Sequence, residues 1–592
     1  MENVKSTRRI LPSCLHAFRS LTTSHISLIS PARLLLHFAP IRGSIAPMPV
    51  GFANLTNWGA GKDVVLPAFA AFQRARVEFA QEVAKLALPA GEALVSKNAA
   101  SGTYETDGAE KVLSTLEASF NLMPEMRSLL TDVAPTVREN AMLAVGRLCG
   151  LSDKLHGQVA DPTLLDATIS TITSSSQPSL VHAAMFLLHT AVRSSAEVAH
   201  LAVEHNALVA VCERLEDTDS QTKQAAVWCL CSIASHEAPL ASAVVEAGAV
   251  PLLILCLKEH SLPLRRLTLS CLGSIAKHEQ VLAEVLHKEG ALSAAVEFLS
   301  SPDMLLRRHA CRALACATQH HTGANEWVPA PARKLLVETM QVADPETLAF
   351  AATLAQQLAK HSNSVASSFH DLGAVPLLVA HMRQGHASPT SAAAAIGHIC
   401  DGSSAAAVAA LQLGVLETIH ALLASHAPVP VCVVLCQCLG AMSNADETVA
   451  KAIDQSGCLQ LVLEATLLSK RKIGPAARQV LRAGLGRALG KCASYPVLVF
   501  LLERLPFTGP HCEPPILAAL LKALARVLST KGTYRLDFMQ RGALSVAQQA
   551  SKIKSPELLD ALKTLNSPSI FPKQMVDATA PDYESKLLDK IV

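Results

Sequence analysis

The amino-acid sequence predicts an all-α fold, a right-handed α-solenoid in which groups of helices repeat about every 42 residues. Residues 237–278 divide into three helices: a short one, a second that is apolar nearly all round, and a longer one with a single apolar face. Such a trio cannot cover its own apolar surface, so it needs copies of itself on both sides. Those copies are visible as a recurring glycine and a recurring histidine.

The recurring glycine marks the corner between the first and second helix of each repeat. Glycine tolerates the positive φ angle that a sharp corner requires, and asparagine is the residue that best replaces it there. A helical period of about 40 to 47 residues is typical of the armadillo and HEAT classes, and three helices with a short first one, rather than two of equal length, favour armadillo. The corner positions, spaced 42, 42, 83, 41, 43 and 85 residues apart, are Asn206, Gly248, Gly290, Gly373, Gly414, Gly457 and Gly542.

The recurring histidines are His236, His278, His320 and His361, spaced 42, 42 and 41 residues apart at the ends of predicted third helices. Equivalent residues of neighbouring repeats lie about 10 Å apart, whereas a zinc ligand lies about 2 Å from its metal. The four side chains therefore cannot share a metal ion, and we expect them to meet terminal helix carbonyls. No metal site is predicted.

Composition excludes several functional classes. The chain has 592 residues and a formal net charge of +2, which argues against nucleic-acid binding over the whole surface. Its 16 cysteines lie mostly in apolar helical patterns, which favours core packing in a reducing, intracellular setting. No apolar run is long and uninterrupted enough to span a bilayer. No phosphate-binding glycine loop, nucleophile elbow or carboxylate pair occurs, so we expect no catalytic residue and no cofactor.

Four regions follow one another along the chain. Residues 1–62 carry many serines and cations but a single acidic residue, Glu2, and are expected to be a disordered or targeting extension. A transit peptide and a mispredicted start upstream of Met48 both remain open. Residues 63–111 are predicted to hold an N-terminal capping helix and a polar loop, residues 112–551 about ten or eleven armadillo repeats, and residues 552–592 a C-terminal capping tail.

Basic residues recur in the first turn of the predicted third helices. Lys223, Arg265 and Arg307 are 42 residues apart, and Arg266 and Arg308 double the last two positions; these five residues are called the basic row. Because third helices line the concave groove of armadillo solenoids, we expect the basic row to follow one edge of that groove. It would bind an acidic partner segment there, the alternative being a solvated charged face.

Trp228 tests another hypothesis, that of a nuclear-import adaptor. Import adaptors of this fold carry tryptophan on successive third helices, with asparagine four residues later. In this chain the fourth residue is Ser232, and the positions equivalent to Trp228 in the next two repeats hold Ser270 and Arg312. The ladder that recognises import signals is therefore absent.

Seven segments share features with one known family: Val65 to Leu86, Leu129 to Arg138, Ala144 to Leu148, Ala243 to Leu253, Ile275 to His278, Asp582-Tyr583 and Lys586 to Ile591. These segments resemble the sperm-associated-antigen armadillo protein family of the axonemal central apparatus, from about residue 64 to the end of the chain. The repeat motifs are weakly specific, whereas the two non-repeating ends single out this family. The residues after Pro376 match it poorly, and residues 1–62 and 91–109 look like additions to its pattern.

The resemblance implies a non-enzymatic scaffold in the axoneme of cilia or flagella, needed for beating. Its partners would be axonemal proteins and the acidic C-terminal tails of tubulin, and the tails would be natural ligands of the basic row. The alternative is an armadillo adaptor outside cilia, for cargo, adhesion or chaperone work in the cytoplasm. A mitochondrial location would follow if residues 1–62 are a transit peptide.

Overall fold

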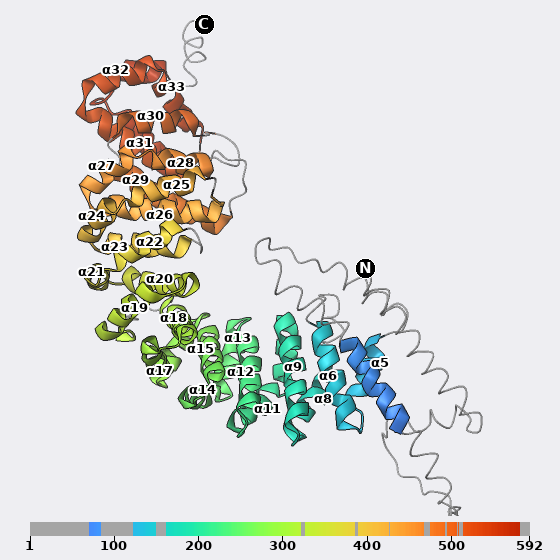
Figure 1. Ribbon diagram of the computed structural model, residues 1–592. Helices are drawn as coiled ribbons and strands as arrows, with labels where there is room; N and C mark the ends of the chain where they lie inside the picture. Colours follow the sequence, from blue (N-terminus) through green and yellow to red (C-terminus); the bar gives the residue numbers. More distant parts are fainter. Residues whose placement is uncertain are drawn as a thin grey trace, which may run out of the picture. The chain divides into compact units, whose positions relative to one another are not determined.

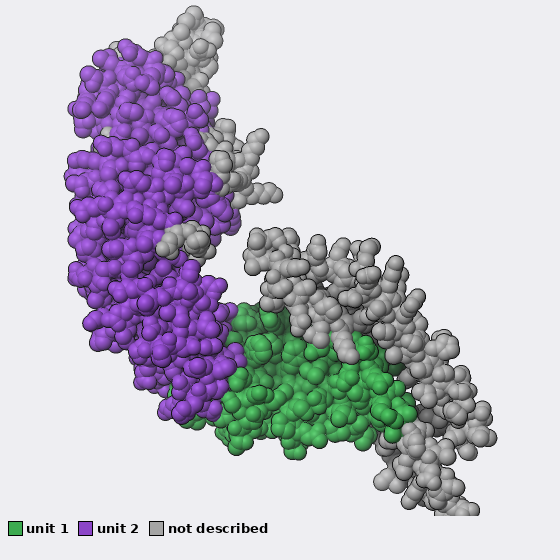
Figure 2. All heavy atoms as spheres, viewed as in Figure 1, with its two compact units in different colours: residues 1–256 green, residues 257–592 purple. Residues whose placement is uncertain are grey.

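The computed structural model describes residues 70–84, 122–149, 161–320, 326–384, 389–425, 427–466, 474–491, 494–505, 507, 513–553 and 555–579. The chain forms two compact units, residues 1–256 and residues 257–592 (Figure 2). Every regular element in the described residues is a helix. The predicted all-α fold class is confirmed, while the expectation for residues 1–62 lies outside the described part of the chain.

Third helices form the central column of each unit (Figure 1). Each packs on the next one along the chain, so this column buries the apolar faces that no single repeat can cover. In unit 1 the column consists of α6 (Pro135–Cys149), α9 (Pro178–Ser194) and α12 (Ser220–Ala234). In unit 2 it consists of α15 (Leu262–Ala276), α18 (Met304–Thr318), α20 (Pro345–Lys360), α23 (Thr390–Gly402), α26 (Val429–Ala445), α29 (Pro475–Lys491), α31 (Pro514–Thr530) and α34 (Pro556–Leu565).

First and second helices form two further columns. Among second helices, contacts run from α8 to α11 in unit 1, and from α19 through α22 and α25 to α28 in unit 2. First helices stack likewise, from α10 to α13 and from α21 through α24 to α27. The first helices are α10 (Ala196–Glu204), α13 (Ala238–Glu246), α16 (Gln280–Lys288), α21 (Asn363–Asp371), α24 (Ser404–Gln412), α27 (Glu447–Gln455) and α32 (Gly532–Gln540). The second helices are α8 (Pro162–Ser174), α11 (Ala207–Glu213), α14 (Ala249–Lys258), α17 (Ala291–Glu297), α19 (Ala330–Val342), α22 (Ala374–Gln384), α25 (Val415–Ala424), α28 (Cys458–Ala465), α30 (Tyr495–Arg504) and α33 (Ala543–Gln548).

The predicted corners between first and second helices are confirmed. All six glycines have φ between 69° and 85°, and Asn206 is the non-glycine residue with positive φ in the described segments, at 62°. At Gly290 the backbone N–H donates to the carbonyl of His287, 3.0 Å away, which closes the last turn of α16 before α17 begins. A residue with a left-handed backbone thus ends one helix and starts the next without an intervening loop.

Neighbouring third helices approach closely at glycines, of which Gly440 and Gly273 are examples. A Cβ atom placed on Gly440 of α26 would lie 2.4 Å from the carbonyl oxygen of Gly484 in α29. One placed on Gly273 of α15 would lie 3.1 Å from the Cα atom of Ala313 in α18. At both positions a larger residue would clash with the backbone of the neighbouring repeat, so the close packing requires glycine. Helical periodicity in the sequence does not reveal this requirement.

The C-terminal end contains more of the repeat than the sequence suggests. α34 lies within residues 552–592, the predicted capping tail, and packs against α31 as the third helix of the repeat that α32 and α33 begin. It is followed by the short helix α35 (Lys573–Ala578). The predicted domain boundaries themselves stay a prediction.

No single helix in the described residues is both long and apolar enough to cross a membrane. Two bent helix pairs, α13 with α14 and α24 with α25, meet the criterion jointly by length and composition.

Candidate functional site

Four of the described third helices have an acidic residue at the N-cap position, and in two of them its side chain accepts a backbone N–H. Asp219, which precedes α12, accepts a hydrogen bond from the backbone N–H of Thr222 at 2.8 Å. Asp303, which precedes α18, accepts one from Leu306 N–H at 2.6 Å. Asp344 and Glu513 occupy the same place before α20 and α31. These carboxylates lie where the first N–H groups of a helix lack intrahelical partners.

A cation or histidine of the preceding third helix reaches each of these caps. His182 Nε2 of α9 lies 3.0 Å from Asp219 Oδ2. Arg266 of α15 binds Asp303 with two nitrogens, at 3.2 and 2.5 Å. This bidentate pair lowers the pKa of Asp303, chiefly through the hydrogen bonds from Arg266. Each contact joins two repeats through the cap of the later one.

Arg308 and Arg482 repeat the arrangement farther along unit 2. Arg308 of α18 binds Asp344 at 2.5 Å and also pairs with Glu346. Arg482 of α29 binds Glu513 at 2.6 Å, and the side chain of Glu513 is only 3% exposed. A buried carboxylate needs such a partner, because burial without one would disfavour its charged form. The capping contacts are thus a structural feature of the third-helix column.

The remaining members of the basic row also have partners. Arg307 donates from Nε to the carbonyl of Ser301, in the loop before α18. The guanidinium of Arg265 lies 5.6 Å from the centre of the Phe298 ring, and its Nη2 donates to the carbonyl of Lys258 at 3.5 Å. Lys223, in unit 1, is half-buried and has a partner as well. Within unit 2, therefore, the four arginines join loops and caps rather than forming a line of unpaired charges.

The sequence did not show that Arg266 and Arg308 pair with aspartates. Their partners lie 37 and 36 residues later, so the contacts depend on how two repeats pack. The available signal was an aspartate at the start of the next repeat's third helix, because Asp303 and Asp344 each directly precede a predicted third helix.

The recurring histidines meet helix carbonyls, as predicted, at the two positions with a defined contact. His236 Nε2 lies 2.7 Å from the carbonyl oxygen of Val192, in the last turn of α9. His320 Nε2 lies 3.0 Å from that of Lys277, which caps α15. Each histidine therefore contacts the C-terminus of the preceding repeat's third helix. Within the described segments, no group of three or more His, Cys, Asp and Glu side chains could hold a metal ion.

Cys432, Cys436 and Cys438 are all buried in α26. Burial raises the pKa of the Cys438 thiol to about 12 and shifts that of Cys436 in the same direction. The thiols of Cys436 and Cys438 are therefore protonated, and all three buried side chains pack as small apolar groups.

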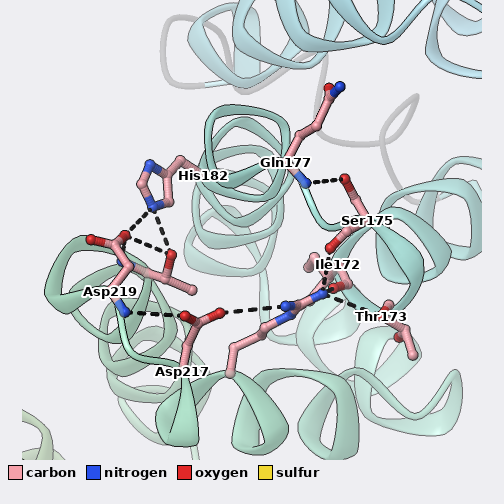
Figure 3. Close-up of polar contacts among 9 residues, drawn as sticks. Ile172, Thr173, Ser175, Gln177, His182, Asp217 and Asp219 are labelled. Carbon is pink, nitrogen blue, oxygen red and sulfur yellow. Dashed lines mark hydrogen bonds and ion pairs between the residues drawn. The ribbon is translucent and has the colours of Figure 1, made fainter.

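Arg214 makes a second kind of joint between repeats in unit 1 (Figure 3). It follows α11 and donates to the carbonyls that end α8, at 2.8 Å to Ile172, 3.2 Å to Thr173 and 2.9 Å to Ser175. Nη1 lies 3.4 Å from Asp217, whose other oxygen accepts the backbone N–H of Asp219. One guanidinium thus donates hydrogen bonds to the terminal carbonyls of α8, which have no partner within that helix. Through Asp217 it also contacts the loop that leads to Asp219, the N-cap of α12.

Trp228 is 50% exposed on α12, and one face of its ring stacks on His189 of α9 at a centroid distance of 4.7 Å. His189 is buried, and its Nδ1 shares a 2.7 Å hydrogen bond with the hydroxyl of Ser232. Burial, followed by the charge of Arg193, lowers the pKa of His189 to about 4. Ser232, where import adaptors carry asparagine, therefore holds a neutral histidine beneath the tryptophan.

A second basic surface, absent from the sequence predictions, lies on α29 and α31. It comprises Arg478, Arg482, Arg487 and Lys491 of α29 with Lys522 and Arg526 of α31, and is called the α29–α31 basic face. The sequence feature that could have predicted this surface is its local excess of positive charge. Residues 470–535 contain twelve Lys and Arg and only two acidic residues. The near-neutral charge of the whole chain conceals this surplus.

No protein-family model matches the chain, and no curated protein matches it. An engineered protein of the Northeast Structural Genomics Consortium aligns with 75% of this chain and 99% of its own, at 20% identity and a TM-score of 0.56. Two designed armadillo repeat proteins each align with 40% of this chain and 99% of their own, at TM-scores of 0.37. They are YIII(Dq)4CqI, at 20% identity, and YIII(Dq.V1)4CPAF in complex with the peptide (KR)4, at 23%. At 20% identity the likeness to the engineered protein concerns the fold alone, and the packed helix trios of the two units are those of an all-α armadillo-repeat solenoid.

Proposed function

We propose that this chain is a non-enzymatic armadillo-repeat scaffold of the ciliary or flagellar axoneme, and that it holds partner proteins along its third helices. The observation that carries the scaffold proposal is the succession of third helices from α15 to α34 in unit 2. Side chains at one helical position, such as Ser270, Arg312 and Thr353, are at least partly exposed along this succession. An extended surface of this kind suits an extended protein segment better than a compact substrate.

The axonemal assignment is supported by the resemblance of the quoted segments to the sperm-associated-antigen armadillo family. Residues 70–84, which fall in one of those segments, are helical. The test is the cellular location of the tagged full-length chain, followed by extraction of axonemes. The assignment predicts that the chain remains with the central apparatus. A location in the cytoplasm, nucleus or mitochondrion would contradict it and favour an adaptor outside cilia.

The basic row is proposed to bind acidic partner segments, with tubulin C-terminal tails as candidates. Support comes from its spacing of one or two cations per repeat, where packed repeats are about 10 Å apart. Arg266 and Arg308 also pair with Asp303 and Asp344, the N-cap residues of α18 and α20. Reversing the charge of these arginines would therefore destabilise the fold as well as remove two cations of the basic row. The binding test therefore neutralises Lys223, Arg265 and Arg307 with glutamine.

Co-sedimentation with microtubules before and after proteolytic removal of the tubulin tails measures the effect. We expect the triple variant to bind less, and binding of the unmodified chain to fall as salt is raised. Exposed charge contacts each contribute about 0 to 1 kcal/mol, so single substitutions should have little effect. Equal binding by the variant and the unmodified chain would refute the role of the row without refuting the axonemal location.

A further inference from the structure

We propose that the α29–α31 basic face is a binding site for an acidic, extended segment of another protein. The inference rests on the chemistry of this face and does not depend on the axonemal assignment. Its first support is charge: α29 carries four cations and α31 carries two, and neither helix contains an acidic residue. Within the described segments, ion pairs join these cations to Glu513, Asp401 and Asp560.

These ion pairs leave positive charge exposed. The buried carboxylate of Glu513 receives Arg482 at 2.6 Å, with Arg478 at 3.9 Å. Arg487 reaches Asp401 at 3.3 Å and stays 49% exposed, while Lys522 reaches Asp560 at 3.3 Å and stays 53% exposed. Ion pairs whose cations are half exposed contribute little to stability, so these side chains can turn toward the carboxylates of a bound peptide.

The two helices form one continuous surface within unit 2. α29 and α31 are neighbours in the third-helix column, and the guanidinium of Arg526 donates to the backbone carbonyl of Gly490. Lys491 is exposed and makes no hydrogen bond or ion pair with the described residues. Six cations thus lie across two packed helices, whose axes are about 10 Å apart. An extended polypeptide covers that distance with about three residues.

The shape of α29 leaves room for a polypeptide backbone between the cations. Its outward face carries the small residues Ala483, Gly486 and Gly490 beside Arg482 and Arg487. A Cβ atom placed on Gly486 or Gly490 would meet no atom within 4 Å, unlike one on Gly484, which faces α26. Interior helical glycines lower helix stability, and these two have no packing requirement that compensates.

The same face is poorly suited to nucleic acid. Proteins that bind single strands stack bases on aromatic side chains, and α29 and α31 contain none. Duplex binding relies on neutralising many phosphates, about six to ten in a typical protein. Here four of the six cations already share three carboxylates. An acidic peptide needs fewer contacts and can follow the small-residue strip, so a protein segment is the occupant that the observations favour.

The test measures binding of a fluorescein-labelled decaglutamate peptide to the full-length chain by fluorescence anisotropy at low and rising salt. Glutamine replaces three exposed cations in the site variant, Arg487→Gln, Lys491→Gln and Lys522→Gln. We expect the Kd to rise about tenfold or more in this variant, from the loss of three weak contacts. Binding to the unmodified chain should weaken steeply with salt.

A control variant changes the net charge equally at sites remote in the fold. Lys258→Gln, Lys288→Gln and Lys334→Gln remove three exposed lysines from α14, α16 and α19, within unit 2. We expect this variant to bind like the unmodified chain. An equal loss of peptide affinity in both variants would overturn the proposal, because the peptide would then be attracted by the overall charge of the protein.

A further variant blocks the strip of small residues on α29 without changing the charge of the protein. Gly486→Leu should keep or raise helix stability, since leucine is a better helix former and its side chain meets open space. It should nevertheless weaken peptide binding, because the side chain occupies the strip between the cations. Unchanged binding would overturn the placement of the peptide. Tighter binding of a single-stranded or duplex oligonucleotide than of decaglutamate would overturn the choice of a protein partner.

Discussion

The substitution Gly440→Ala tests whether close backbone contact between α26 and α29 holds unit 2 together. The new Cβ atom would lie 2.4 Å from the carbonyl oxygen of Gly484 and 3.0 Å from its Cα atom. Ordinary van der Waals contact begins at 3.4 Å, so the two helices must separate by about 1 Å. A gap of 0.5 to 1 Å already removes about a quarter to a half of the dispersion energy between facing atoms.

The expected cost exceeds the gain in helix propensity. Replacing glycine by alanine within a helix favours the helix by about 1 kcal/mol. Overpacking costs about 1 to 3 kcal/mol in ordinary cores and more where backbone must move. We therefore expect the α26–α29 pair to lose about 1 to 3 kcal/mol of local stability. Hydrogen exchange of amides in these two helices should quicken by about 5- to 150-fold.

Gly486→Ala, in the same helix α29, is the matched control. It gains the same helix propensity but meets no atom within 4 Å, so exchange there should slow by about fivefold. Hydrogen exchange by mass spectrometry resolves individual repeats, which suits a chain whose units contact only their neighbours. If both substitutions change exchange in the same direction, the contact between Gly440 and Gly484 does not limit the packing of these repeats.

Three further predictions concern joints between repeats. Asp303→Asn should cost about 1 kcal/mol at pH 7, because the Arg266 pair lowers the pKa of Asp303. A depressed carboxyl pKa contributes stability that is fully present above its unfolded value of about 3.9 and is lost as the pH falls through the lower folded-state pKa. The difference should therefore shrink steadily below about pH 3.9 in urea titrations. Burial lowers the pKa of His189 to about 4, so acidification from about pH 6.5 to 4 should destabilise its repeat by about 3 kcal/mol. Fluorescence of Trp228, stacked on this ring, should report the titration, and His189→Leu should abolish it. Arg214→Ala should speed hydrogen exchange at the C-terminal end of α8 about tenfold, because three carbonyls lose their donor.

Each of these has its own control. Fluorescence of Trp228 is isolated by replacing Trp58 and Trp327 with phenylalanine, and a midpoint near 6.5 would contradict a buried, neutral His189. For Arg214 the matched substitution is Arg193→Ala, an exposed arginine of α9, which should leave exchange in α8 unchanged. An Asp303→Asn defect that does not shrink at all as the pH falls below about 3.9 would show that the charge of the pair is not its cause.

The sequence by itself determined the repeat and its corners. Each corner needs a local backbone conformation, and glycine or asparagine records that requirement in the residue itself, as at Asn206. The third helices were predictable for a similar reason, since one apolar face repeats at helical spacing. The contact of His236 with a terminal carbonyl followed from its place at a helix end.

Tertiary structure decided which charged side chains form ion pairs within the fold. Arg266 looks like an exposed cation in its own helix, and its aspartate lies 37 residues later in the next repeat. Gly440, Gly484 and Gly486 are the same residue in similar apolar helices, yet the first two contact backbone and the third faces open space. The reason is that helical periodicity fixes the angle of a side chain around its own helix. The distance to the neighbouring helix depends on how the repeats pack, and that distance decides whether a charge is paired or a glycine is required.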